Sequence, residues 1–168
     1  MKILSIDIGM VSLGYCMWDS ENDSMKFGIC NVREMVPKKS AKDYCLIAHT
    51  FIEKRRDIFK GVNVMLLERQ IKAGMKQLAT ALRAFLWSTA KVYLVAPITV
   101  KRFFNISTGS YNTNKNAAIE RFEELADRNT MLRFRLLNKK QKTDIADAFL
   151  QLHWYLFRKK IRQNPLSN

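Results

Sequence analysis

Residues 1–32, MKILSIDIGMVSLGYCMWDSENDSMKFGICNV, decide the fold, because they contain three mostly apolar stretches joined by short links. Residues 1–9, 14–19 and 25–32 each have the length and the apolar content of a strand. Residues 20–24 are rich in Asn, Asp and Ser, which is typical of a turn. Strands this close along the chain pair as an antiparallel meander, because a parallel connection needs a dozen or more residues.

The rest of the chain alternates helical and strand patterns. Compact apolar runs at residues 62–67 and 91–95 predict two buried strands. Helices are expected at residues 41–59, 70–87, 114–126 and 143–162, with a short helix in the irregular stretch 98–111. This order predicts an α/β chain with the ribonuclease H-like fold: a five-stranded mixed sheet, made of a three-strand antiparallel meander plus two parallel strands, flanked by helices. At this length we expect a single nuclease-sized domain, residues 1–168.

The chain is strongly basic. It has 29 Lys and Arg against 15 Asp and Glu, a formal net charge of +14 and an isoelectric point near 9.9, which predicts a polyanionic partner. No apolar stretch approaches the roughly 20 residues of a membrane span, and the apolar start is too short for a signal peptide, so we expect no membrane partner and no secretion. Cys16, Cys30 and Cys45 lack the paired spacing of zinc sites and are expected to be reduced core thiols in a reducing, intracellular compartment.

Four acidic residues stand where a phosphodiesterase with two metal ions needs them. Asp7 lies in the first strand, and Glu68 follows the strand at 62–67. The helix between these strands allows a crossover to a parallel neighbour, which would bring Glu68 close to Asp7. Asp144 and Asp147 lie about 60° apart on a helix and can face one point. Converging carboxylates repel one another unless cations balance them, and oxygen ligands favour Mg²⁺ or Mn²⁺, so we expect two such ions and no small-molecule cofactor.

Each acid also has a simpler explanation when it is taken alone. Asp144 could be a first-turn acid stabilised by the helix dipole, with Thr143 as the helix cap. Glu68 could pair with Arg69 or Lys72 at the surface, and the acid of the first strand could belong to a turn. Taken as a set in this order of elements, the four acids favour the metal site.

The histidines and the paired phenylalanines are assigned to packing instead of chemistry. His153 lies about 180° around its helix from Asp144, and His49 is expected to be a surface or packing residue. Phe103 and Phe104 could stack on unpaired bases, but adjacent aromatic residues in a short element more often pack in a core.

Four segments resemble the motifs of the poxvirus-type Holliday junction resolvases, which are relatives of bacterial RuvC. They are residues 5–9, 66–70, 110–122 and 142–148, in the family's order. Leu-Leu-Glu-Arg-Gln and Asp-Ile-Ala-Asp at this spacing are specific, whereas Asp-Ile-Gly alone is common. Two positions depart from the pattern: Met10-Val11-Ser12 follows Gly9 where many poxvirus members have Lys-Asn-Pro, and Thr143 stands where an aspartate is frequent.

The resemblance implies a homodimer that makes paired, symmetric incisions in four-way DNA junctions, with two Mg²⁺ or Mn²⁺ ions in each active site. It implies that Asp7, Glu68, Asp144 and Asp147 are metal ligands and that Lys115 is a catalytic lysine, which steadies the scissile phosphate or the attacking water. Further basic residues are candidate DNA contacts. They are Lys101, Arg69, Lys72, Lys139, Lys140 and Lys142. A viral member would work at cytoplasmic replication sites of the host cell.

Three other functions remain open at this point: a ribonuclease H or another nuclease on a hybrid or branched substrate, a non-catalytic nucleic-acid-binding module, and an ATPase. The ATPase is disfavoured because actin-like ATPases, which also open on Asp-Ile-Gly, need two such domains. The seam of a dimer could use Met75, Leu78, Leu82 and Phe85 of the helix at 70–87, although the same stripe could pack on its own sheet.

Overall fold

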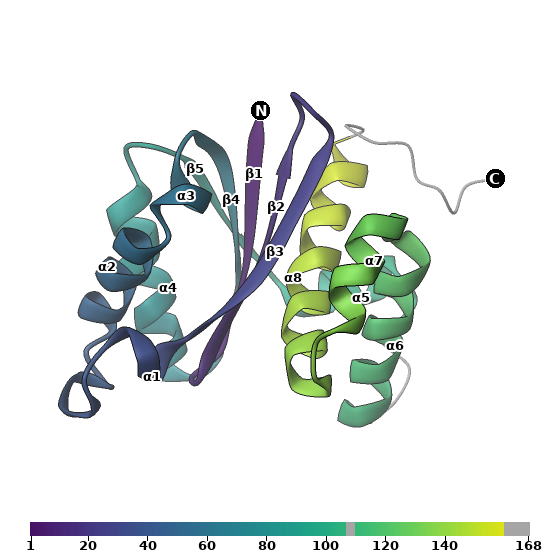
Figure 1. Ribbon diagram of the computed structural model, residues 1–168. Helices are drawn as coiled ribbons and strands as arrows, with labels where there is room; N and C mark the ends of the chain where they lie inside the picture. Colours follow the sequence, from purple (N-terminus) through teal and green to yellow (C-terminus); the bar gives the residue numbers. More distant parts are fainter. Residues whose placement is uncertain (107–109, 160–168) are drawn as a thin grey trace.

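The computed structural model describes residues 1–106 and 110–159, in which five strands form one mixed sheet with the order β3-β2-β1-β4-β5 (Figure 1). The strands are β1 (Lys2–Ile8), β2 (Ser12–Asp19), β3 (Ser24–Asn31), β4 (Val62–Glu68) and β5 (Lys91–Val95). The pairs β1–β2 and β2–β3 are antiparallel, whereas β1–β4 and β4–β5 are parallel. The predicted meander with two parallel strands is therefore confirmed.

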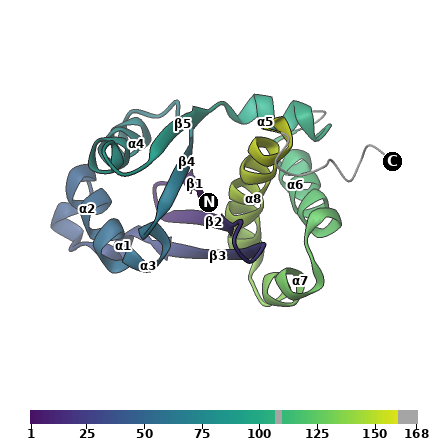
Figure 2. The same cartoon turned by 90° about the horizontal axis from the view of Figure 1, so that it is seen from above.

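Helices cover both faces of the sheet, as the view from above shows (Figure 2). One face is covered by α2 (Tyr44–Lys54) and α4 (Ala73–Leu86), next to the short elements α1 (Val32–Met35), η1 (Lys38–Ser40) and α3 (Arg56–Phe59). The other side carries α5 (Pro97–Phe103), α6 (Tyr111–Leu125), α7 (Arg128–Arg135) and α8 (Lys139–Arg158). Of these four helices, α8 packs directly on β1 and β2, and α6 packs on α8.

The alternation of side chains along β1 directs Asp7 toward α8. Leu4, Ile6 and Ile8 belong to the core beneath α2 and α4. Ser5, on the opposite face, accepts a hydrogen bond of 3.0 Å from the side-chain amide of Gln151 on α8. Because alternate residues of a strand share a face, Asp7 faces the same helix as Ser5.

The last helix begins four residues earlier than the sequence analysis predicts. Asn138 caps α8, and Gln141 completes a reciprocal capping box with it. Thr143 is therefore inside the helix, where its buried hydroxyl donates to the carbonyl of Lys140 at 2.7 Å, and the prediction of a Thr143 cap is wrong. The predicted end of this helix at residue 162 lies outside the described residues.

Two other helical predictions need correction. The helix predicted at residues 41–59 is two helices, because Arg55 leaves the helical conformation with φ −122° and ψ 35°. The helix α7 was not predicted at all. Its polar sequence carries few apolar residues, and Asp127 starts it by accepting hydrogen bonds from the backbone of Asn129 and Thr130.

The apolar stripe of α4 packs mainly against its own sheet. Leu78 and Leu82 are buried in the core with β1 and β4, so these two members of the stripe are not available to a partner. Phe85 is 46 % exposed and Met75 is partly buried. The centre of the stripe therefore packs on the sheet of its own chain and does not form a dimer interface.

Several side chains confirm or correct smaller predictions. Phe104 is fully buried and Phe103 packs against it at 4.9 Å between ring centroids, so Phe104 belongs to the core. Cys16 and Cys30 are buried free thiols, as predicted, but Cys45, in the first turn of α2, is exposed. Among the described helices, none is long and apolar enough to cross a membrane.

Candidate active site

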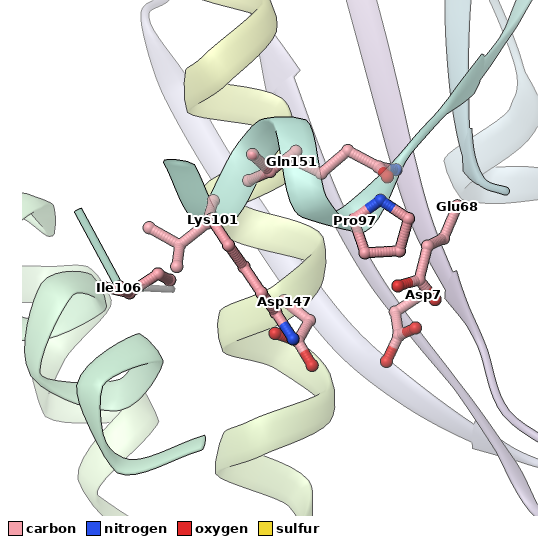
Figure 3. Close-up of a pocket in the computed structure, with 9 residues that line it drawn as sticks. Asp7, Glu68, Pro97, Lys101, Ile106, Asp147 and Gln151 are labelled. Atoms are coloured by element: carbon pink, nitrogen blue, oxygen red, sulfur yellow. The ribbon is translucent and has the colours of Figure 1, made fainter. Parts of the chain in front are cut away.

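Three of the four predicted acids meet at one small cavity of about 20 Å³, with Asp7 from β1, Glu68 from β4 and Asp147 from α8 (Figure 3). The parallel pairing of Ile6 with Leu67 sets the next residue of each strand side by side, as the crossover argument predicts. The rest of the wall is mostly apolar: Pro97, Val100, Lys101, Ile106, Leu150 and Gln151. A cavity of this size holds one species about as large as a water molecule.

Asp7 is the electrostatic centre of the cavity. Burial raises its pKa well above the ordinary value, and the nearby carboxylates of Glu68 and Asp147 raise it further. Lys115 acts in the opposite direction. The contact with Glu68 also raises the pKa of Asp7. A cation bound at these carboxylates would relieve the repulsion between them.

Two glutamines hold the strand-end carboxylates and their surroundings in place. Gln70 donates from its side-chain amide to Glu68 at 2.6 Å. Gln151 lines the cavity and ties α8 to β1 through Ser5. The sequence analysis did not select either glutamine, although Gln151 lies four residues after Asp147, on the same face of the helix.

Lysines approach the acids from two other helices. Lys115 on α6 forms an ion pair with Asp147, with 2.7 Å between Nζ and Oδ2, and both side chains are 21 % exposed. Lys101 on α5 lines the cavity, and Figure 3 shows its side chain reaching toward Asp147. The structure therefore brings Lys115 and Lys101, two of the candidate basic residues, to the acids.

Asp144 faces away from this cavity. Its Oδ2 accepts a hydrogen bond of 2.7 Å from the hydroxyl of Ser12, and it lines a neighbouring polar groove with Asn31, Lys140 and Gln141. It lies in the second turn of α8, so the description of Asp144 as a first-turn acid is wrong. Asp144 is bonded to Ser12 and Asp147 to Lys115, and within residues 1–106 and 110–159 no group of three His, Cys, Asp or Glu is placed to hold a metal ion.

The other candidate DNA-binding residues come shortly after Glu68 or shortly before Asp144 in the sequence. Arg69 and Lys72 are exposed after β4, and Lys139 and Lys140 are exposed at the start of α8. Lys142 is different, because its ammonium lies over the ring of Phe134 at 5.7 Å from the centroid. The two histidines stay out of the site, since His153 is buried against Phe149 and His49 packs on Phe85.

Comparisons with known proteins show which family and which solved structures the chain is similar to. The sequence model of the family described as "Poxvirus A22 protein" matches residues 1–158. The crystal structure of the fowlpox virus Holliday junction resolvase is similar, with a TM-score of 0.62 and 22 % identity over 95 % of this chain and 99 % of that chain. The same resolvase in complex with its substrate Holliday junction DNA has a TM-score of 0.61 and 19 % identity, covering 96 % and 100 % of the two chains.

A bacterial protein shares the fold more distantly. RuvC of Thermus thermophilus in complex with a Holliday junction substrate has a TM-score of 0.54 and 13 % identity over 95 % of this chain and 96 % of that chain. No protein among those with curated descriptions matches the sequence. The structural likenesses confirm the predicted ribonuclease H-like fold.

Proposed function

Because the chain belongs to the Poxvirus A22 protein family, whose model matches it over residues 1–158, we propose that it is a metal-dependent endonuclease that resolves four-way DNA junctions. The observation that carries the chemistry is the meeting of Asp7, Glu68 and Asp147 at one cavity with Lys101 and Lys115 beside them. The junction substrate is supported by the family and by the likeness to two resolvases that have been seen with Holliday junction DNA.

In this proposal Asp7 and Glu68 bind the first cation between the ends of β1 and β4. The two acids follow paired residues of parallel strands, and Gln70 keeps Glu68 oriented. Asp147 and Asp144 supply ligands from the α8 side. When bound, Mg²⁺ or Mn²⁺ stabilises negative charge on the phosphoryl oxygens and activates the attacking water. Two ions per site is the arrangement that we propose for this set of oxygen ligands.

Lys115 has the role of a phosphate-positioning group. Its ammonium is already held at the rim by Asp147 at 2.7 Å, so a phosphate oxygen that enters the cavity meets a donor that is in place. Lys101 approaches the same point from α5, and the two lysines offset the charge of the incoming phosphate.

The exposed bases on either side of the acids are the proposed contacts to the DNA backbone. Arg69 and Lys72 follow Glu68 directly, while Lys139 and Lys140 precede Asp144. A protein that neutralises phosphates in this way shows binding that weakens steeply with salt, and each lost contact lowers the salt slope by about 1. A four-way junction needs two symmetric cuts, so we propose that two copies of the chain act together as a homodimer.

The test is cleavage of a synthetic four-way junction, compared with a linear duplex and an RNA–DNA hybrid. Wild type should cut the junction in Mg²⁺ and not in EDTA, and Asp7→Asn should bind the junction without cutting it. Cleavage of the hybrid alone would favour a ribonuclease H function instead. Binding without any metal-dependent cleavage, even by wild type, would favour a non-catalytic module.

A further inference from the structure

The helix α7 and the first turn of α8 form a strongly basic surface. Residues 128–143 contain six basic residues and no acidic one. The six are Arg128, Arg133, Arg135, Lys139, Lys140 and Lys142, of which all but the last are exposed. None of the ion pairs within residues 1–106 and 110–159 involves any of them, whereas Arg121 on the neighbouring α6 is paired with Glu124. The charge of this segment is therefore available to an anionic partner.

Aromatic rings anchor this basic segment to the sheet. Phe134 of α7 is fully buried and packs edge-on against Phe27 of β3, with 6.5 Å between ring centroids. The guanidinium of Arg133 lies over the ring of Phe27 at 4.9 Å from the centroid, and the ammonium of Lys142 lies over Phe134. Contacts of this kind hold cationic side chains in place. The basic groups are therefore presented by a fixed helix at one edge of the helical layer (Figure 2).

The outer face of α7 carries apolar side chains that the fold leaves exposed. Thr130 and Phe134 are buried and mark the inner face. A step of two residues turns a helix by about 200°, so Leu132 and Leu136 point away from the core. Leu132 is 56 % exposed and Leu136 is 87 % exposed. Arg128 and Arg135 lie within a turn of Leu132 on the same side, so the two leucines are set among positive charges.

The same surface continues toward the active site. Lys139 is the first residue of α8, and Asp147 lies eight residues later, about 12 Å along the axis at about 1.5 Å per residue. One strand of DNA rises about 3.4 Å per nucleotide, so this distance corresponds to about three or four nucleotides. Asn138, Lys140 and Gln141 line the polar groove of Asp144, which extends the surface from α7 toward the cavity. A DNA strand at the cavity is therefore close enough to meet α7.

We propose that the outer face of α7 is a second DNA-binding surface that recognises the branch point. In this proposal Arg128 and Arg135 hold the backbone, and Leu132 and Leu136 pack on bases that have lost a stacking partner. The inference rests on the proposed function above, because it takes a junction as the substrate. Apolar side chains of DNA-binding proteins insert where stacking is interrupted, and an intact linear duplex does not offer open base faces at the same low cost. The leucines then favour branched over linear DNA, while the arginines bind both.

A solvated surface and a lipid surface are the two alternatives. Single exposed leucines are common in soluble proteins, but these two lie four residues apart on one face among unpaired cations. Helices that bind anionic membranes are amphipathic and usually add exposed aromatic residues, whereas Phe134 of α7 is buried. Charge complementarity to DNA and continuity with the groove of Asp144 therefore favour the nucleic acid.

The test is equilibrium binding in EDTA to a fluorescent four-way junction and to a linear duplex of the same arm sequence. The double variant Leu132→Ser/Leu136→Ser removes the apolar pair, and Leu132→Met/Leu136→Met keeps it apolar. Arg128→Gln/Arg135→Gln removes two charges. Leu46→Ser, at a 37 % exposed leucine of α2 across the sheet, is the apolar control. Lys60→Gln/Lys91→Gln, at exposed positions before β4 and at the start of β5, is the charge control at the opposite end of the strands from Glu68.

The serine variant should bind the junction about tenfold more weakly than wild type, since it loses the burial of two leucines, and bind the linear duplex as wild type does. The methionine variant should keep the preference for the junction. Arg128→Gln/Arg135→Gln should weaken binding to both DNAs by similar factors and lower the salt slope of each by about 2. Both controls should match wild type. Thermal unfolding should be unchanged in the serine variant, because the replaced side chains are exposed.

Wild-type affinity for the junction in the serine variant would overturn the inference, and so would equal weakening toward junction and duplex. Loss of binding to phosphatidylserine vesicles in that variant, with junction affinity intact, would assign the surface to lipid and overturn it as well. These readouts need no cleavage. A wild-type protein that prefers the junction in EDTA but never cuts it in Mg²⁺ would overturn the proposed nuclease function, while the result for the leucines would still decide this inference.

Discussion

Replacing Asp7 by Asn should abolish cleavage and yet stabilise the metal-free protein. Asp7 is partly buried beside Glu68 and Asp147, and its desolvation and the two neighbouring carboxylates together raise its pKa. Two unit charges about 4 Å apart at an effective dielectric constant of about 20 repel by about 4 kcal/mol. Because the raised pKa lets Asp7 hold a proton that relieves part of this repulsion, we expect a gain of about 2 kcal/mol in the free energy of unfolding.

The gain should depend on pH with a defined sign. Below the ordinary aspartate pKa of 3.8 the carboxyl is protonated in both the folded and the unfolded state, and its burial carries no electrostatic penalty. As the pH rises from 3.8 toward the raised pKa of folded Asp7, the unfolded chain gives up this proton while the folded protein keeps it, so the metal-free wild type loses stability until the raised pKa is passed. The advantage of Asp7→Asn should therefore be small in acid and largest at neutral pH.

The assay is thermal unfolding of wild type and Asp7→Asn in EDTA and in Mg²⁺, at several pH values. At about 2–4 °C per kcal/mol for a domain of this size, the variant should melt roughly 4–8 °C above wild type in EDTA at neutral pH. Mg²⁺ should raise the melting temperature of wild type and have little effect on the variant. Glu21→Gln, at an exposed position, is the control and should match wild type. A melting temperature of Asp7→Asn at or below that of wild type in EDTA would refute the account of the cavity as an uncompensated carboxylate cluster.

Three further predictions concern groups around the cavity. Lys115→Ala should lower the single-turnover rate of junction cleavage by about 10²- to 10³-fold with little loss of junction affinity, because it removes the donor that Asp147 holds beside the cavity. If the cleavage rate and the junction affinity fall by similar factors, Lys115 acts in DNA binding instead. Gly14→Ala should lower the free energy of unfolding by about 1–3 kcal/mol, because the added Cβ would lie 2.6 Å from the carbonyl oxygen of Asp144. A denaturant unfolding curve with an unchanged midpoint would contradict the close approach of α8 to β2. Mn²⁺ affinity, measured by calorimetry, should fall as the pH is lowered from neutral toward the raised pKa of Asp7, because protons and the cation compete for that carboxylate; affinity that is independent of pH would argue against a ligand role for Asp7.

The sheet could be predicted from the sequence because its strands leave strong local signals. β1 and β4 are buried on both faces, so they read as almost continuous apolar runs. The parallel crossover between them then predicts that Glu68 lies beside Asp7 without any further information. These two acids needed only the order of the elements and the rule for crossover connections.

The start of α8 carries a signal in the sequence before Thr143. Asn138 and Gln141 have the spacing of a capping box, and the structure uses this pair as the cap in place of Thr143. The four-residue shift moves Asp144 from the first turn to the second and removes the helix-dipole explanation for that acid.

The orientation of Asp144 could not be predicted from local patterns. It depends on a hydrogen bond from Ser12, which lies 132 residues away, and on the absence of a side chain at Gly14. The pairing of Asp7 with Gly14 across β1 and β2 places that glycine at the site, but a register of this kind is known only once the sheet is known. Side-chain contacts between distant elements are the part of a site that sequence patterns specify least.

The charges around the cavity explain how a basic chain that binds a polyanion can also contain an acidic site. When ionised, Asp7, Glu68 and Asp147 at the cavity and Asp144 in the adjacent groove carry four negative charges, and Lys101 and Lys115 return two positive ones. The difference of two negative charges is what one divalent cation balances. In the proposed mechanism the cation and the scissile phosphate carry opposite charges, so metal binding and DNA binding should assist each other. In this way the dispersed lysines and arginines attract the DNA over long range, while the acids at the cavity make cleavage depend on the cations.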